Sequence, residues 1–260
     1  MSTPTLLAEG ELTVEGRVVA ASNLTLYARV DGPDGSTMPC VYKPVSGERP
    51  LWDFPDGTLA ARERAAFLVS EAGGWHLVPQ TVLRDGPLGP GMCQEWVTAE
   101  HDVDWVAVVD ADDEVAASWL PVLRGQDESG RAVTLVHRDD PRLRGVAVLD
   151  AVLNNADRKG GHLLAGPSGS LVGVDHGLCF HREPKLRTVL WGWRGQPLTS
   201  AERTQLLGLA EWLDEDSHEL DDLLTGTESA ALRTRVAALL EVGRLPFPSR
   251  SWPAIPWPAM

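Results

Sequence analysis

The chain has 260 residues, and its 23 basic against 37 acidic side chains give a net charge of −14. Its length and 43% hydrophobic content suit one large globular domain or two lobes around a cleft. The pI near 4.9 argues against nucleic-acid binding and against stable membrane association. Three separated cysteines exclude a paired zinc or disulfide pattern, and no signal peptide or long apolar run is present, so we expect a cytoplasmic protein.

The first part of the chain predicts an antiparallel sheet interrupted by one helix. Apolar and polar side chains alternate between Gly and Pro turns in three stretches, residues 9–45, 76–84 and 91–98. Residues 58–73 are rich in alanine and other helix formers, with Thr58 or Asp56 to cap the helix. Gly73 and the glycine after it predict its end.

Beyond residue 97 the chain predicts mainly helices. Residues 100–114 are acidic and predict a solvated face, and a helix is expected over 113–124. Asp140 followed by proline predicts the capped start of an apolar helix. Two capping-box patterns, which begin at Thr199 and Thr225, predict two further helices.

These elements predict an α+β, two-lobed fold. Residues 1–97 would form a β-rich N-terminal nucleotide-binding lobe with one helix, and residues 98–245 a mainly helical catalytic lobe. The tail, residues 246–260, is too rich in proline for helix or sheet. We identify no internal repeat.

Two acids mark the densest polar region. Asp157 lies in the stretch Asn154-Asn-Ala-Asp-Arg-Lys-Gly-Gly-His162, and Asp175 follows a predicted strand eighteen residues later. Such a pair suits metal-assisted phosphoryl transfer, in which one acid orients a nucleophile and the other holds a metal ion across phosphates. The alternative is a polar hairpin in which Asn and Asp only form turns.

The spacing resembles the catalytic and metal-binding loops of the phosphatidylinositol 3-/4-kinase-like superfamily, part of the protein-kinase-like superfamily. Asp157-Arg158, with His162 five residues after the acid, resembles its Asp-Arg-His-x-x-Asn loop, and Asp175-His-Gly177 its Asp-Phe-Gly element. Most of residues 6–245 resembles an actinobacterial phosphatidylinositol 3-/4-kinase-like family, through VYKPVSGERPLWDFPDGTLA, GPLGPGM, NNADRKGGH and KLRTVLWGW. HipA-type kinases are more distantly similar.

The remaining parts of a kinase site can be assigned by position. Lys43 on a strand would contact ATP phosphates, and Glu63 on the 58–73 helix would hold that lysine. The alternative is that both are ordinary surface charges. Ser22 and Asn23 would form the phosphate-covering turn. Backbone groups of the linker, at Gln94, Glu95 and Val97, would hydrogen-bond adenine.

Two positions depart from the family pattern. His162 replaces the metal-binding asparagine, and imidazole favours Mn²⁺ or Zn²⁺ more than Mg²⁺. Either His162 binds metal together with Asp175, or one metal site is altered. Lys159 replaces the histidine of the loop and could neutralise the transferred phosphoryl group. These changes leave open a catalytically weak kinase or a pseudokinase, and an active enzyme would use ATP with Mg²⁺ or Mn²⁺.

The segment after Asp175 is a candidate acceptor loop. Arg182, Lys185 and Arg187 could receive an anionic substrate beside Trp191 or Trp193, or the segment could be a structured loop with core tryptophans. The chain has only three lysines, Lys43, Lys159 and Lys185, and all three fall on this predicted phosphate path.

The sequence therefore predicts an ATP-dependent kinase that acts on a hydroxyl of a polar small molecule or a protein. The alternatives are a nucleotide-binding pseudokinase that regulates a partner, and an AMP transferase.

Overall fold

The computed structural model describes residues 1–18, 23–55, 58–99, 103–166, 169–215 and 219–260. The N-terminal part contains an antiparallel sheet of order β1-β2-β3-β5-β4. Its strands are β1 (Glu11–Arg17), β2 (Leu26–Asp31), β3 (Thr37–Pro44), β4 (Thr81–Gly86) and β5 (Gly89–Glu95). A short helix that the sequence reading did not predict, α1 (Thr3–Glu9), packs Leu6 and Leu7 into the small core of this sheet.

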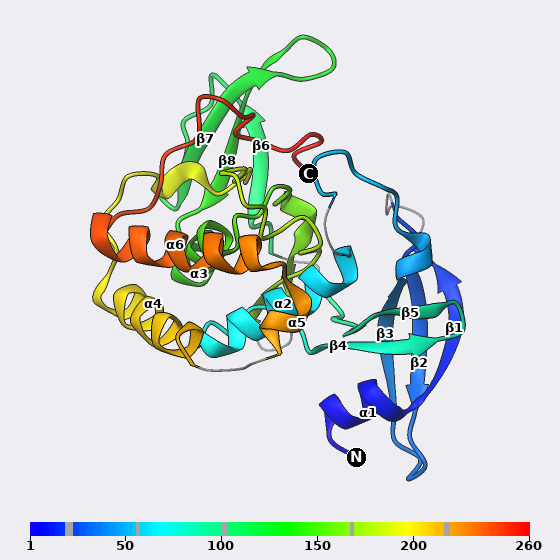
Figure 1. Cartoon of the computed structure of the whole chain (residues 1–260). Helices are drawn as coiled ribbons and strands as arrows, with labels where there is room; N and C mark the ends of the chain where they lie inside the picture. Colours follow the sequence, from blue (N-terminus) through cyan, green and yellow to red (C-terminus); the bar gives the residue numbers. More distant parts are fainter. Residues whose placement is uncertain (19–22, 56–57, 100–102, 167–168, 216–218) are drawn as a thin grey trace.

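The predicted 58–73 helix is confirmed as α2 (Leu59–Ala72). The Thr58 side chain accepts the Ala61 N–H at 3.1 Å, which identifies the cap, and Gly73 follows the last turn. Figure 1 shows α2 between the N-terminal sheet and the C-terminal helices. Its buried side chains Ala65, Ala66 and Val69 belong to the larger core, which is built mainly from the C-terminal part.

The helix predicted over 113–124 is wrong. An antiparallel sheet of order β6-β8-β7 covers this region, with β6 (Val106–Asp110), β7 (Trp119–Gln126) and β8 (Ala132–Arg138). Pro121 lies within β7, where it would have broken a helix, but β7 is an edge strand and tolerates the missing N–H. The register shifts between Pro121 and Leu123, as at a β-bulge.

Three C-terminal helices begin where the caps predict: α3 (Pro141–Leu153), α4 (Ser200–Leu213) and α6 (Gly226–Val242). The short helix α5 (Leu220–Leu223) was not predicted, and its N-cap residue Glu219 makes no side-chain capping bond. Asp140 caps α3, and both capping boxes form at Thr199 and Thr225. The predicted strand before Asp175 is β10 (Leu171–Gly173), which forms a hairpin with β9 (Leu163–Ala165). Short 3₁₀ turns occur at η1 (Val45–Gly47), η2 (Gly160–His162) and η4 (Trp191–Trp193).

These elements confirm an α+β, two-lobed architecture, although the C-terminal lobe carries a sheet as well as helices (Figure 1). We retain the division at residue 97 as a proposal, because β5 ends at Glu95 and β6 begins at Val106. The tail, residues 246–260, contains no helix or strand. None of the helices in the described ranges is long and apolar enough to cross a membrane.

A buried ion pair connects α2 to α6. Arg62 and Glu228 are 2% and 5% exposed, and their side chains meet at 2.7 Å. Arg62→Met would leave the Glu228 carboxylate buried without its countercharge, so we expect it to lower the free energy of unfolding by about 3–5 kcal/mol. Urea denaturation measures this loss.

The exposed pair of Arg131 and Asp127 is the matched control. Arg131→Met should lower the free energy of unfolding by about 1 kcal/mol or less, because water screens this pair. Equal losses for Arg62→Met and Arg131→Met would contradict a structural role of the buried pair.

Candidate active site

Three segments far apart in the sequence meet at Lys43. Cys40 and Tyr42 of β3 point into the small core, and the strand alternation therefore directs Lys43 to the opposite face. Its Nζ lies 2.6 Å from Glu63 Oε1 on α2 and 2.9 Å from Asp175 Oδ1 just after β10. Burial would lower the pKa of Lys43, but the two carboxylates outweigh it and raise that pKa, so the ammonium is kept.

Glu63 is the buried anchor of this cluster, with 1% exposure. Its second oxygen, Oε2, accepts the backbone N–H of His176 at 2.9 Å. Glu63 therefore connects the lysine of β3 to the segment that contains Asp175, and it requires α2 to lie at a defined position.

Glu48 holds the start of α2 and was missed by the sequence reading. Its carboxylate accepts the N–H groups of Leu59 at 3.0 Å and Ala60 at 2.9 Å. These are free donors of the first helical turn, where a negative charge is favourable. Glu48 lies eleven residues before the helix, so no local capping pattern reveals it.

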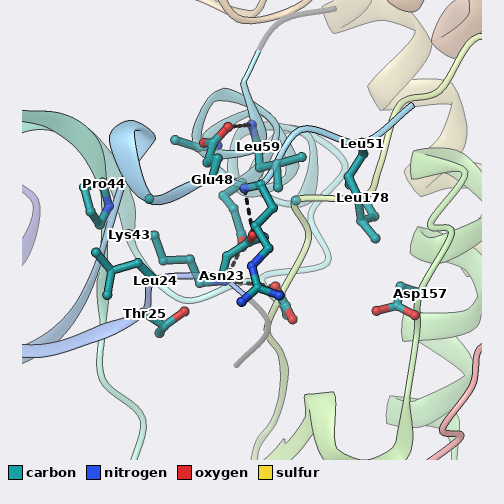
Figure 2. Close-up of a pocket in the computed structure, with 16 residues that line it drawn as sticks. Asn23, Leu24, Thr25, Lys43, Pro44, Glu48, Leu51, Leu59, Asp157 and Leu178 are labelled. Atoms are coloured by element: carbon teal, nitrogen blue, oxygen red, sulfur yellow. Dashed lines mark hydrogen bonds and ion pairs between the residues drawn. The ribbon is translucent and has the colours of Figure 1, made fainter. Parts of the chain in front are cut away.

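Asp157 lines the same cavity as Lys43, Glu63 and Asp175, a hollow of about 270 Å³ between the lobes. Figure 2 shows Asp157 across this cavity from Lys43. Lys159 Nζ lies 3.0 Å from the Asp157 carboxylate. Burial raises the pKa of Asp157, and Lys159 opposes that rise.

A fully buried arginine connects the two acidic loops. Arg158 pairs with Asp150 of α3 at 3.0 Å and donates to the Val174 carbonyl at 2.9 Å. Its Nη2 lies 2.7 Å from His176 Nε2. Burial holds the pKa of His176 well below its usual value, so the ring is neutral and Nε2 accepts from the guanidinium.

His162 lies beside Asp175, with Nε2 3.5 Å from Oδ2. Burial lowers the pKa of His162 to about 4, so its imidazole is neutral at pH 7. The Lys43 ammonium holds the pKa of Asp175 well below its usual range. Asp175 itself adopts φ of 61°, an uncommon conformation that aspartate tolerates better than most residues.

Asp175 and His162 fit a divalent cation that takes its other ligands from elsewhere. Within the described ranges, no group of three or more His, Cys, Asp or Glu side chains forms a complete metal site. Ions such as Mg²⁺ are commonly held by one or two carboxylates together with phosphate oxygens and waters. A half-exposed Asp175 carboxylate on the cavity meets that requirement.

The residues predicted to contact nucleotide divide into two groups. Asn23 lines the cavity and its Oδ1 accepts the Arg49 N–H at 3.0 Å, whereas Ser22 lies outside the described residues. None of the linker residues Gln94, Glu95 and Val97 is among the described residues that line the cavity.

Two groups of the linker have partners in the N-terminal part of the chain. Gln94 is buried and donates to the Thr81 hydroxyl at 2.8 Å. The Glu95 N–H donates to the Gln80 carbonyl at 2.9 Å. The adenine contact at this linker stays a prediction.

Lys185 is 4% exposed and does not line the cavity. Its Nζ lies 3.1 Å from Asp53 and 4.5 Å from the centroid of the Trp252 ring. Lys185 therefore does not face the cavity at Lys43, as the prediction of an anionic-substrate contact would require. It instead links the 48–55 loop to the tail. Trp193 is a core residue, and Trp191 and Arg182 line a different groove.

The tail contacts the loop in which Asp157 lies. The tail also contains a short repeat that the sequence analysis did not identify, Trp252-Pro-Ala and Trp257-Pro-Ala. The Ala254 carbonyl accepts the Thr188 N–H at 3.1 Å, and the Ala259 carbonyl accepts the Gly160 N–H at 2.8 Å. Figure 1 shows this segment in red along the C-terminal lobe. This repeat is the sequence signal that could have predicted the tail contacts, because the alanine of each copy supplies one of the two carbonyls.

Comparison with known proteins places the chain among its relatives. It is 50% identical over 264 aligned residues to Protein Rv2133c of Mycobacterium tuberculosis, with 98% of this chain and 94% of that protein covered. The chain belongs to the Rv2133c family. No protein-family model matches it, so the phosphatidylinositol 3-/4-kinase-like assignment is not confirmed.

A solved structure establishes the fold. The crystal structure of the Golgi casein kinase matches with a TM-score of 0.50 and 12% sequence identity, over 91% of this chain and 72% of that one. The predicted protein-kinase-like fold is confirmed.

The two tryptophans of the tail repeat provide a matched test of its docking. Trp252 contacts Lys185, whereas Trp257 is 83% exposed. We expect Trp252→Ala to lower the free energy of unfolding by about 1–3 kcal/mol, through lost packing and a lost cation–π contact, and Trp257→Ala to change it by about 0.5 kcal/mol or less. Chemical denaturation of both variants measures the difference, and equal effects would contradict the docked tail.

Proposed function

We propose that the protein is an ATP-dependent phosphotransferase that acts on a hydroxyl group. One observation carries the proposal: the Lys43 ammonium lies between Glu63 and Asp175 on a cavity that Asp157 also lines. A kinase needs a lysine for nucleotide phosphates, an acid to hold it, an acid for metal and an acid for the acceptor. The kinase-like fold supports the same reading.

Each side chain has a role that its surroundings support. Lys43, oriented by Glu63, would bind phosphate oxygens, and Asp175 with His162 would hold Mg²⁺ or Mn²⁺. The metal ion would supply positive charge to neutralise the phosphates. Asp157 would orient the acceptor hydroxyl and accept its proton as the phosphoryl group leaves ADP. Lys159, 3.0 Å from Asp157, would stabilise negative charge beside that reaction.

The acceptor would be a polar small molecule, such as a polyol, or a protein serine or threonine. The resemblance to phosphatidylinositol 3-/4-kinase-like proteins supports an alcohol acceptor. The chain's strong negative charge argues against a lipid held in an anionic membrane.

A pseudokinase is the second candidate, and the observation that favours it is His162. This neutral imidazole stands where the family places a hard amide oxygen, and Asp175 is already paired with Lys43. ATP would then raise the melting temperature without turnover.

Transfer of AMP is the third candidate activity. Intact-mass analysis separates it from phosphorylation, because AMP adds far more mass than a phosphoryl group.

Substitution of the three central residues tests the assignment. Asp157→Asn should reduce ATP turnover by about 10²-fold or more because it removes the proton acceptor, and Lys43→Met and Asp175→Asn should do the same by removing charges from the phosphate site. Asp113→Asn, an exposed acid on a distant turn, is the control.

Turnover is measured with Mg²⁺ and with Mn²⁺ against a metabolite extract, with products identified by mass spectrometry. Folding of each variant is checked by its melting temperature. Wild-type turnover in a folded Asp157→Asn/Asp175→Asn double variant would overturn the proposal.

The pH dependence tests Asp157 specifically. Its ionised form accepts the proton, so activity should fall as pH decreases through its pKa, which burial raises above that of an ordinary aspartate. Lys159 lowers this pKa, and Lys159→Met should therefore move the acidic limb of kcat/KM to higher pH. A limb that does not move, or moves to lower pH, would show that Asp157 does not titrate in that limb.

A further inference from the structure

A second hollow lies on the far side of the C-terminal lobe and shares no lining residue with the cavity at Lys43. It has a volume of about 840 Å³. Its walls are α6, the 182–191 segment and residues 244–249, and most of its side chains are apolar, including Leu186, Trp191 and Leu245.

One face of α6 forms the long wall of this groove. Ala231, Arg235, Ala238 and Val242 follow at spacings of four, three and four residues, which places them on one side of the helix. The small alanine side chains leave the groove open. Val242 at 66% and Phe247 at 69% exposure leave apolar surface uncovered at this wall.

All the charged side chains that line the groove are basic, and its other polar lining residues, Asn154, Thr234 and Ser249, are neutral. Arg182, Arg235 and Arg244 line it, no acidic side chain is among its described lining residues, and none of the three forms an ion pair with a described carboxylate. In a chain of net charge −14, such a basic lining is a local exception.

Arg235 is the most desolvated of the three. It donates to the Val152 carbonyl at 2.9 Å and the His181 carbonyl at 3.2 Å, and its Nη2 is buried without a partner among the described residues. Burial lowers the pKa of Arg235 to about 10, yet the group stays charged at pH 7. A nearby anion would offset that cost.

We propose that this groove binds a small amphiphile, a free long-chain carboxylate whose chain lies against α6 and Trp191 and whose head group lies among the arginines. The volume falls within the range of small-molecule sites, roughly 300–1,000 Å³. Apolar walls whose charged groups are all cationic favour a ligand that is both apolar and anionic. The inference does not depend on the proposed kinase activity.

Calorimetric titration with saturated carboxylates of increasing chain length, each below its micelle concentration, tests this chemistry. Affinity should rise by about fourfold for each added methylene until the groove is filled. The alcohol of equal length should bind about tenfold more weakly or worse, because it lacks the charge, and the alkylammonium should not bind. Equal affinity for alcohol and carboxylate, or preference for the ammonium, would overturn the proposal.

Two neighbouring alanines of α6 locate the site. Ala238→Trp fills the groove and should abolish carboxylate binding, whereas Ala237→Trp, on an exposed position outside the lining, should bind as the unmodified protein does. Arg182→Gln should weaken the carboxylate while leaving the alcohol unchanged. If a folded Ala238→Trp variant binds the carboxylate with unchanged affinity, the groove is not the site.

A vesicle arm separates the free ligand from a membrane surface. Sedimentation with phosphatidylglycerol vesicles should leave the protein in the supernatant. Co-sedimentation that Ala238→Trp abolishes would overturn the proposal of a free ligand, because the groove would then be docking on lipid.

Discussion

The position of the Lys43 ammonium is the constraint on which the site depends. A lysine that is largely withdrawn from water needs compensating charge, and Glu63 and Asp175 supply it at 2.6 and 2.9 Å. Because one residue belongs to β3, one to α2 and one to the chain after β10, the two lobes must meet in one arrangement for all three to pair. The ion pairs thus help to define the geometry of the cleft as well as its chemistry.

Other buried charges support that arrangement from both sides. Glu48 holds the first turn of α2, which positions Glu63. Arg158 links Asp150 to the Val174 carbonyl and to His176, which positions the loops that contain Asp157 and Asp175. Each of these groups would be costly to bury alone, so the network is stable only when the elements are placed together.

Local signals in the sequence predicted much of the frame. Caps at Thr58, Asp140, Thr199 and Thr225 concern contacts a few residues apart, and all four form where expected. The edge strand β7 was mistaken for a helix because its composition resembles one, and only pairing with β8 decides its conformation. Pro121 was the one local signal against the helix.

The sequence could not show which distant segments of the chain meet at the site. The motif spacing identified Lys43, Glu63, Asp157 and Asp175 as candidates, and the structure brings all four to one cavity. The motif spacing could not show that Lys185 is buried against Asp53 and Trp252, because those partners lie 132 and 67 residues away in the sequence.

The sequence by itself therefore determined the starts of the four capped helices, the acidic character and the residue types that suit phosphoryl transfer, because these follow from composition and near-neighbour chemistry. The tertiary structure decided which of the charges are paired, which face the cleft, and that the tail docks beside the Asp157 loop. These depend on packing between distant segments, because a buried charge is destabilising unless that packing brings it to a partner. The same packing leaves the basic groove open beside α6, and no local pattern in the sequence predicted this groove.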